Sequence, residues 1–101
     1  MFKGGMAGMM KKAQQMQDNV QQAQAEIKQL SAVGSAAGNA FKVTVNGEHQ
    51  ITDIQIDESM MADKEVLEDL ILTAVNDANR QISSATKAKM KGATGGMSLP
   101  F

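Results

Sequence analysis

The sequence predicts an α+β fold in which two helices accompany a small antiparallel sheet. Apolar residues recur every three or four positions from Met6 to Leu30 and again from Leu67 to Ile82, as they do on the buried faces of helices. Between these stretches, residues 41–56 alternate between apolar and polar side chains with the period of half-buried strands. The predicted order of elements is therefore helix, strands, helix.

The first helix is predicted from Met6 to Leu30, a stretch without proline that is rich in good helix formers. Its apolar positions have the spacing of a heptad seam. They are Met6, Met9, Ala13, Met16, Val20, Ala23, Ile27 and Leu30. Such a helix is about 37 Å long, whereas a compact domain of this size has a radius of gyration of about 13 Å. We therefore expect the helix to overhang its own domain, with its seam packed partly on the second helix and partly on a second subunit. The alternative is an ordinary amphipathic core helix.

The alternation in residues 41–56 predicts a β-hairpin. Asn46 and Gly47 suggest a two-residue turn, but that turn would place Val45 opposite Glu48 on the apolar face. We therefore expect a four-residue loop at 46–49. This loop pairs Phe41 with Ile54 and Val43 with Thr52. Because two strands alone are marginally stable, residues 31–35 are the candidate for a third strand.

The second helix is expected to begin after Asp63, which can cap it, and to end at Gly92. Its buried face is expected to hold Leu67, Leu70, Ile71, Ala74, Ala78 and Ile82. Residues 1–92 are thus predicted to form one domain, and residues 93–101, with two glycines and a proline, a flexible tail.

The composition limits the chemistry that the chain can perform. The 101 residues include no cysteine and one histidine, which excludes disulfides, thiolate metal sites and clusters of histidine ligands. No catalytic constellation is found, so we expect no enzyme activity, cofactor, metal or small-molecule substrate. No apolar run approaches the ~18 residues of a membrane span, and we expect a cytoplasmic protein. Since small domains commonly need further support, a partner subunit is expected.

Charge is strongly segregated along the chain, although the net charge is only −1. Residues 1–17 contain three lysines and no acidic residue, and residues 78–101 contain four basic residues and no acidic one. Residues 18–77 hold all eleven acidic residues. Arg80, Lys87 and Lys91 are spaced so that they share one stripe of the second helix. The two basic ends favour a polyanionic partner. The alternative is that the cations gather near a helix C-terminus and on solvated faces.

Several short motifs, in order, resemble the YbaB/EbfC family of bacterial nucleoid-associated proteins over essentially the whole chain. They are MFKGG at 1–5, KVTVNG at 42–47, IQID at 54–57, LEDL at 67–70, NDA at 76–78 and MSLP at 97–100. The resemblance implies an α-β-β-β-α protomer that forms a tweezer-like homodimer. It also implies that the dimer binds double-stranded DNA, alters its conformation, and contributes to nucleoid organisation and gene regulation.

The family's DNA-contacting region can be carried over only to the cations of the helices and the basic ends. These are Lys3, Lys11, Lys12, Arg80, Lys87, Lys89 and Lys91. We expect them to contact backbone phosphates, which position a protein on DNA without reading its sequence. The predicted dimer interface consists of Met9, Ala13, Met16, Val20, Phe41 and Val43.

Two other classes of protein remain open from the sequence. In the first, the chain is a small acidic dimeric adaptor or chaperone whose methionine-rich first helix binds client proteins. In the second, it is a purely structural coiled-coil dimeriser whose basic ends bind nothing specific. Salt-sensitive binding to DNA distinguishes the nucleoid-associated protein from both.

Overall fold

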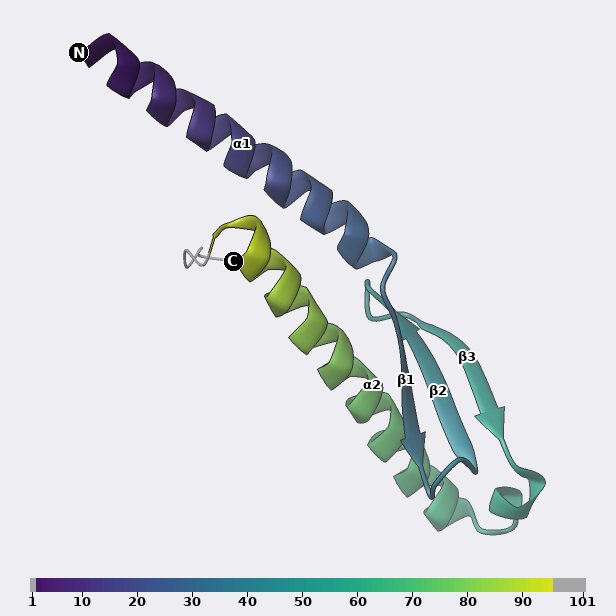
Figure 1. Cartoon of the computed structure of the whole chain (residues 1–101). Helices are drawn as coiled ribbons and strands as arrows, with labels where there is room; N and C mark the ends of the chain where they lie inside the picture. Colours follow the sequence, from purple (N-terminus) through teal and green to yellow (C-terminus); the bar gives the residue numbers. More distant parts are fainter. Residues whose placement is uncertain (1, 96–101) are drawn as a thin grey trace.

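The computed structural model describes the backbone of residues 2–95 and the side chains of residues 5–95. It confirms the α+β fold: an N-terminal helix, a three-stranded antiparallel sheet and a long C-terminal helix. The described chain is a rod of 74 × 19 × 17 Å. As Figure 1 shows, the sheet occupies one end of this rod and the N-terminus of the first helix occupies the other.

Helix α1 (Phe2–Lys28) leads directly into strand β1 (Ser31–Ala36). The predicted overhang is confirmed, because the N-terminal part of α1 extends past the end of helix α2 (Lys64–Ala93) in Figure 1. The two helices run antiparallel, and the seam of α1 faces α2 along its C-terminal half. Ala23 is 4% exposed there, while Met16, Val20 and Ile27 are half-buried.

The sheet has the order β1-β2-β3, with β2 at Phe41–Asn46 and β3 at Ile51–Ile56. The third strand expected at 31–35 is therefore confirmed as β1, which continues to Ala36. Strand β2 lies in the middle, and its side chains alternate between fully buried and half-buried. This pattern is the one that the alternation in residues 41–45 predicted.

The predicted register of the hairpin is wrong by two residues. Phe41 pairs with Ile56 and Val43 with Ile54. One residue of the shift comes from the loop, which is 47–49 because the backbone N–H of Asn46 donates to the carbonyl of Gln50. The Asn46 side chain also accepts hydrogen bonds from the backbone N–H groups of Glu48 and Gln50. The other residue of the shift comes from a bulge in β3, where Thr52 is an extra residue and Val45 pairs with Ile51.

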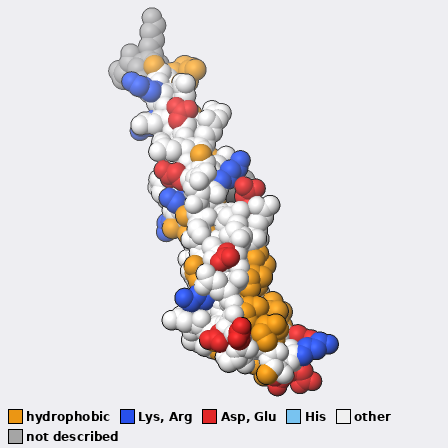
Figure 2. Space-filling view, turned by 90° about the vertical axis from the view of Figure 1, so that its right-hand side faces the viewer, with side chains coloured by type: hydrophobic (Ala, Val, Ile, Leu, Met, Phe, Trp, Pro, Cys, Tyr) orange, Lys and Arg blue, Asp and Glu red, His pale blue; other side chains and the backbone are white. Residues whose placement is uncertain are grey.

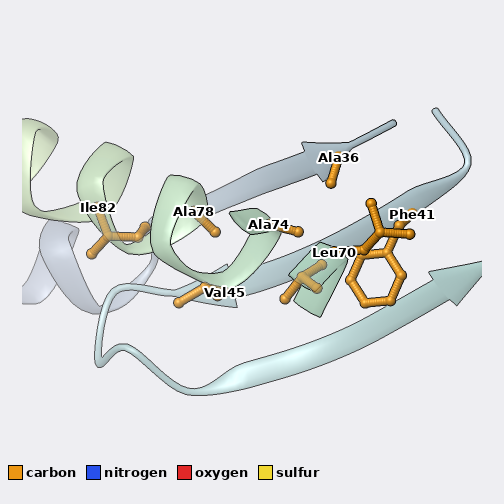
Figure 3. Packing of buried hydrophobic residues seen from close by; sticks show 8 residues of the cluster. Ala36, Phe41, Val45, Leu70, Ala74, Ala78 and Ile82 are labelled. Carbon is orange, nitrogen blue, oxygen red and sulfur yellow. The ribbon is translucent and has the colours of Figure 1, made fainter. Parts of the chain in front are cut away.

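The core lies between α2 and the first two strands. Figure 3 shows Leu70, Ala74, Ala78 and Ile82 on the inner face of α2, directed toward Phe41 and Val45 of β2. Four of the six predicted helix positions are thus buried, whereas Leu67 is half-buried and Ile71 is 41% exposed. The prediction is wrong for Ile71 because α2 lies over β1 and β2 and not over β3.

A short 3-10 helix, η1 (Glu58–Ala62), connects β3 to α2. The predicted cap of α2 is confirmed, because Oδ1 of Asp63 accepts hydrogen bonds from the backbone N–H groups of Glu65 and Val66. The predicted end at Gly92 is wrong by one residue, since α2 continues to Ala93. Residues 96–101, most of the predicted tail, lie outside the described part of the chain.

Candidate nucleic-acid interface

Arg80, Lys87 and Lys91 of α2 lie on the side of the helix that faces away from the sheet. Positions 76, 80 and 84 each follow a buried alanine or isoleucine by two residues, and at about 100° per residue they lie on the opposite side of the helix. This outer face carries a shallow hollow with a volume of 740 Å³. It is lined by Asn76, Asn79, Arg80, Ser83, Ser84 and Lys87. We call these six residues, together with Lys91, the outer stripe.

Electrostatically, the outer face of α2 has two halves. Glu65 and Asp69 precede Asn76 at helical spacing, so the first half of this face is acidic. From residue 78 onward, the helix carries only basic and neutral side chains. The basic half runs beside the C-terminal half of α1 and continues beyond the sheet, and it would attract an anion more strongly than the acidic half.

Arg80 and Lys87 present their charges to solvent. Arg80 lies 3.5 Å from Asp77, but its side chain remains 75% exposed. Asp77 is also engaged by strand β1, since its Oδ2 atom accepts a hydrogen bond from the backbone N–H of Ser35. The guanidinium of Arg80 therefore stays available to a second partner.

Lys89 differs from the other cations of α2. Its Nζ atom lies 3.4 Å from Oε2 of Glu26 on α1, and its side chain is 35% exposed. It points toward α1 because α1 packs on this side of α2. The structure therefore places Lys89 in a link between the two helices, whereas the other cations of α2 face solvent.

The structure brings part of the basic N-terminal segment beside the basic end of α2. Lys12 lines a hollow of 260 Å³ together with Met16 and residues 92–95 at the end of α2. Lys11, the residue before Lys12, is also exposed, and the side chain of Lys3 lies outside the described residues. Described cations of both helices are thus brought close together where α1 passes the end of α2.

Sequence reasoning missed the uncharged members of the outer stripe. Asn76, Arg80, Ser83 and Lys87 are spaced by four, three and four residues, which places them in one line along the helix. The sequence contains this spacing, but the charge pattern identifies only the basic members of the line. Asparagine and serine side chains can donate hydrogen bonds to phosphate oxygens, so they extend the polar surface between the cations.

His49, in the loop between β2 and β3, has a structural contact. Its Nδ1 atom lies 2.9 Å from Oδ1 of Asn79, and its backbone has a positive φ of 62°. The contact ties the loop to α2. Among the described residues there is no group of three side chains that could hold a metal ion.

The residues predicted for the dimer interface lie in three different environments. Met9 is 73% exposed and Ala13 is also exposed, while Met16 and Val20 are half-buried beside α2. Phe41 and Val43 have no exposed surface, because they form the core beneath α2. These two side chains therefore have no surface to offer a partner.

The structure instead exposes a group of isoleucines on the core-facing side of the sheet. Ile51, Ile54 and Ile56 of β3 stand opposite the buried residues of β2 and share their face, yet they are 38–50% exposed. Ile71 of α2, which follows the buried Leu70, is also exposed, at 41%. We call these four residues the isoleucine ledge. Figure 2 shows hydrophobic side chains gathered along this half of the molecule.

The two edges of the sheet differ in how their backbone groups are satisfied. At the outer edge of β1, the carbonyl of Val33 accepts a hydrogen bond of 2.9 Å from Gln81 of α2. The neighbouring N–H of Ser35 donates to Asp77. Strand β3 forms the other edge, and all six of its residues are exposed. The protein thus blocks one edge with α2 and leaves the edge beside the isoleucine ledge open.

A DNA-binding protein is the class to which this fold and its basic end correspond. Residues 2–97 match the model of the YbaB/EbfC DNA-binding family, and the chain belongs to this family. It is 48% identical over 100 residues to nucleoid-associated proteins of Polynucleobacter necessarius and Polynucleobacter asymbioticus. Each alignment covers 99% of this chain and 94% of the relative.

The fold is also found among solved structures. An uncharacterised protein from Helicobacter pylori is similar, with a TM-score of 0.65 and 24% sequence identity. The match covers 82% of this chain and 86% of the Helicobacter chain. Within the described residues, no helix combines the length and hydropathy that crossing a membrane requires.

Proposed function

We propose that the protein binds double-stranded DNA as a homodimer, alters the conformation of the DNA, and thereby contributes to nucleoid organisation and gene regulation in the bacterial cytoplasm. Membership of a DNA-binding family supports this proposal. The observation that carries it is the outer stripe, where Arg80, Lys87 and Lys91 lie on a solvent-facing surface of a helix that has no acidic residue from position 78 onward.

The dimensions of the outer stripe suit a DNA duplex. From Asn76 to Lys91 it is about 22 Å long, and a helix with its side chains is about 10–12 Å wide. The major groove of B-DNA is about 12 Å wide. The helix can therefore lie in or across this groove, with its lysines and arginine at the phosphates and its asparagines and serines between them.

Contacts to phosphates fix the position of the protein on the DNA and give little sequence specificity. Hydrogen bonds to phosphate carry little information about the bases, so preference among duplexes arises from their shape and deformability. A dimer doubles the number of cations and fixes the distance between two stripes. The DNA must then adapt to that distance, which is the proposed origin of its altered conformation.

The second copy is proposed to dock on the isoleucine ledge. Four partly exposed isoleucines on one face, next to an open strand edge, form an apolar surface that a monomer leaves in water. Phe41 and Val43, which the sequence also suggested, are already buried in the protomer. The ledge lies at the sheet end of the rod, so this arrangement leaves both basic ends free for DNA.

The test is equilibrium binding of labelled duplexes of unrelated sequence, followed by fluorescence anisotropy across a range of salt concentrations. We expect binding at about 50 mM salt that weakens steeply toward about 200 mM, with a log-log slope of about −0.9 for each phosphate neutralised. Affinities for unrelated duplexes should be similar. Absence of binding at the lower salt concentration would contradict the proposal and favour the adaptor or chaperone class.

A further inference from the structure

The N-terminal part of α1 carries an apolar surface that neither the core nor α2 covers. Met6 is 68% exposed and Met9 is 73% exposed, and Ala13 beside them is also exposed. Both methionines are more exposed than Leu72, whose side chain lies on α2 and is 63% exposed. We call Met6, Met9 and Ala13 the distal seam.

The distal seam continues a surface that is already used for helix packing. Met6, Met9 and Ala13 have the same heptad spacing as Met16 and Val20, which are half-buried beside α2. The end of α2 lies beside Lys12 and Met16 of α1. The same face of α1 thus packs on a helix along its C-terminal half and lacks one along its N-terminal half. A heptad seam is a surface that another helix fits.

We propose that the distal seam packs against the distal seam of a second copy, and that this contact links DNA-bound molecules to one another. This inference rests on the proposed DNA-binding function. The two helices pack antiparallel, tip to tip, so that Met6 of one copy lies opposite Ala13 of the other and the two Met9 side chains meet near the centre. The antiparallel arrangement also keeps the positive ends of the two helix dipoles apart.

Charge makes this contact dependent on DNA. Residues 1–17 contain Lys3, Lys11 and Lys12 and no acidic residue, so two tips repel each other in the absence of an anion. Phosphates beside Lys11 and Lys12 neutralise this repulsion. DNA therefore serves both as the ligand of the basic end and as the counter-charge that lets two seams approach.

The small size of the contact also indicates that it depends on DNA. Three helical positions from each copy bury far less than the ~1,200 Å² that stable interfaces require. The contact is therefore weak between free molecules. Molecules held on the same DNA have an effective concentration in the millimolar range, which is sufficient for a weak contact to form. The expected result is cooperative binding on long DNA and bridging between duplexes.

The test compares Met6→Gln/Met9→Gln with Met10→Gln in the full chain. Met10 is a matched control, because it is 71% exposed on the same helix but lies off the heptad seam. Gln and Met have similar helix propensity, and all three side chains are exposed, so the fold should be retained. Bridging is measured as capture of a labelled duplex by an immobilised one, and binding as anisotropy of a short duplex.

We expect the seam double variant to lose at least about tenfold in bridging while its affinity for the short duplex stays within about twofold. The Met10→Gln variant should bridge as the wild type does. Equal bridging by all three proteins would overturn the inference. Equal losses of short-duplex affinity in the seam and Met10 variants would also overturn it, since the methionines would then contact DNA directly.

Cross-linking provides a second readout, because the chain contains no cysteine. A Met9→Cys variant should form a disulfide-linked pair under oxidation when DNA is present, whereas Met6→Cys should not, because its copies lie at opposite ends of the contact. Linked Met6→Cys without linked Met9→Cys would overturn the antiparallel arrangement. If the wild type binds no DNA at all, the proposed function fails, and this inference fails with it.

Discussion

Gly34 shows how a single residue sets the distance between the sheet and α2. A Cβ atom at this position would overlap the backbone carbonyl of Ala74 and lie 2.6 Å from the backbone nitrogen of Ala78. Both neighbours are themselves fully buried alanines. Strand β1 and helix α2 can therefore approach closely only because all three residues are small.

We predict that Gly34→Ala destabilises the fold by at least about 2 kcal/mol, because the obstacle is backbone that cannot move aside without shifting α2. Gly8→Ala is the control. It meets nothing within 4 Å on exposed helix α1 and should stabilise by about 0.5–1 kcal/mol. Thermal unfolding at one fixed protein concentration measures both. A Gly34→Ala protein as stable as the wild type would contradict this account of the packing.

The carboxylate of Asp57, which caps the short helix η1, makes a contribution to stability that depends on pH. This carboxylate accepts hydrogen bonds from the backbone N–H and the hydroxyl of Ser59, and these bonds lower the pKa of Asp57 below its usual 3.8. A lowered pKa in the folded state gives stability that is present above the unfolded pKa and is lost as the pH falls through the folded pKa.

The stability difference between the wild type and Asp57→Ala should therefore be present at neutral pH and shrink as the pH falls below 3.8. Urea unfolding at several pH values gives this difference. Because Asp57 is fully exposed, a small effect is expected. A difference that increases on acidification would show that Asp57 is not stabilised as a carboxylate.

At the scale of elements, two contacts hold α1 to the rest of the molecule in addition to the packing of its seam on α2. The loop between β2 and β3 packs against its C-terminus, where a Cβ on Gly47 would overlap the carbonyl of Ile27. Further along, the ion pair between Lys89 and Glu26 joins α1 to α2. These contacts fix the direction in which the overhanging part of α1 leaves the domain.

Lys87 and Lys89 should therefore respond differently to the same substitution. Lys89→Gln removes the link to Glu26 and should cost up to about 1 kcal/mol of stability, since the pair is partly exposed. Lys87→Gln should leave stability unchanged and weaken DNA binding, with a salt slope reduced by about 0.9 per protomer. Unfolding and anisotropy measured on both variants test this. A larger loss of DNA affinity in Lys89→Gln than in Lys87→Gln would contradict the assignment.

Periodicity was sufficient to predict the elements, because each buries one face over many residues. It identified both helices and the hairpin within residues 41–56, and residue type identified Asp63 as the cap of the second helix. It could not give the register of the hairpin, since this depends on hydrogen bonds of the Asn46 side chain and on the bulge at Thr52. The loop and the bulge each shift the register by one residue. Because a total shift of two residues leaves every side chain on the same face of the sheet, Ile54 and Phe41 still share a side.

The candidate site was predicted only in part, for a related reason. Charge along the sequence identified the basic segments, but it could not distinguish Lys89, which pairs with Glu26, from Lys87, which faces solvent. Nor could it show that Phe41 and Val43 are covered by α2 while Ile54 is exposed. Both distinctions depend on where α1 and α2 lie relative to the sheet.

At the scale of the whole molecule, the proposed dimer interface and the proposed DNA-binding surface lie on different parts of the rod. The isoleucine ledge lies at the sheet end, beside an open strand edge, whereas Lys87 and Lys91 lie toward the end of α2, which finishes beside residues 12–19 of α1. This separation allows dimerisation and DNA binding to be altered one at a time.

Ile54→Lys should weaken the dimer by at least about 100-fold, because it places an unpaired charge in the proposed interface. Val33→Lys is the matched control, since both side chains are 50% exposed in the sheet but Val33 faces the opposite side. Sedimentation equilibrium measures the dissociation constants. Equal effects of the two substitutions, or a wild type that is monomeric at high concentration, would exclude the ledge as the dimer interface.

The central claim is that the outer stripe of α2 binds DNA. It is tested most directly by the salt dependence of duplex binding in the Arg80→Gln/Lys87→Gln/Lys91→Gln variant. The control is Lys28→Gln/Lys42→Gln/Lys64→Gln, which has the same net charge but keeps the stripe. We predict that the stripe variant loses most of its affinity at about 50 mM salt, with a shallower log-log slope, while the control binds nearly as the wild type does. Equal loss in both variants would show that only net charge matters and would contradict the account.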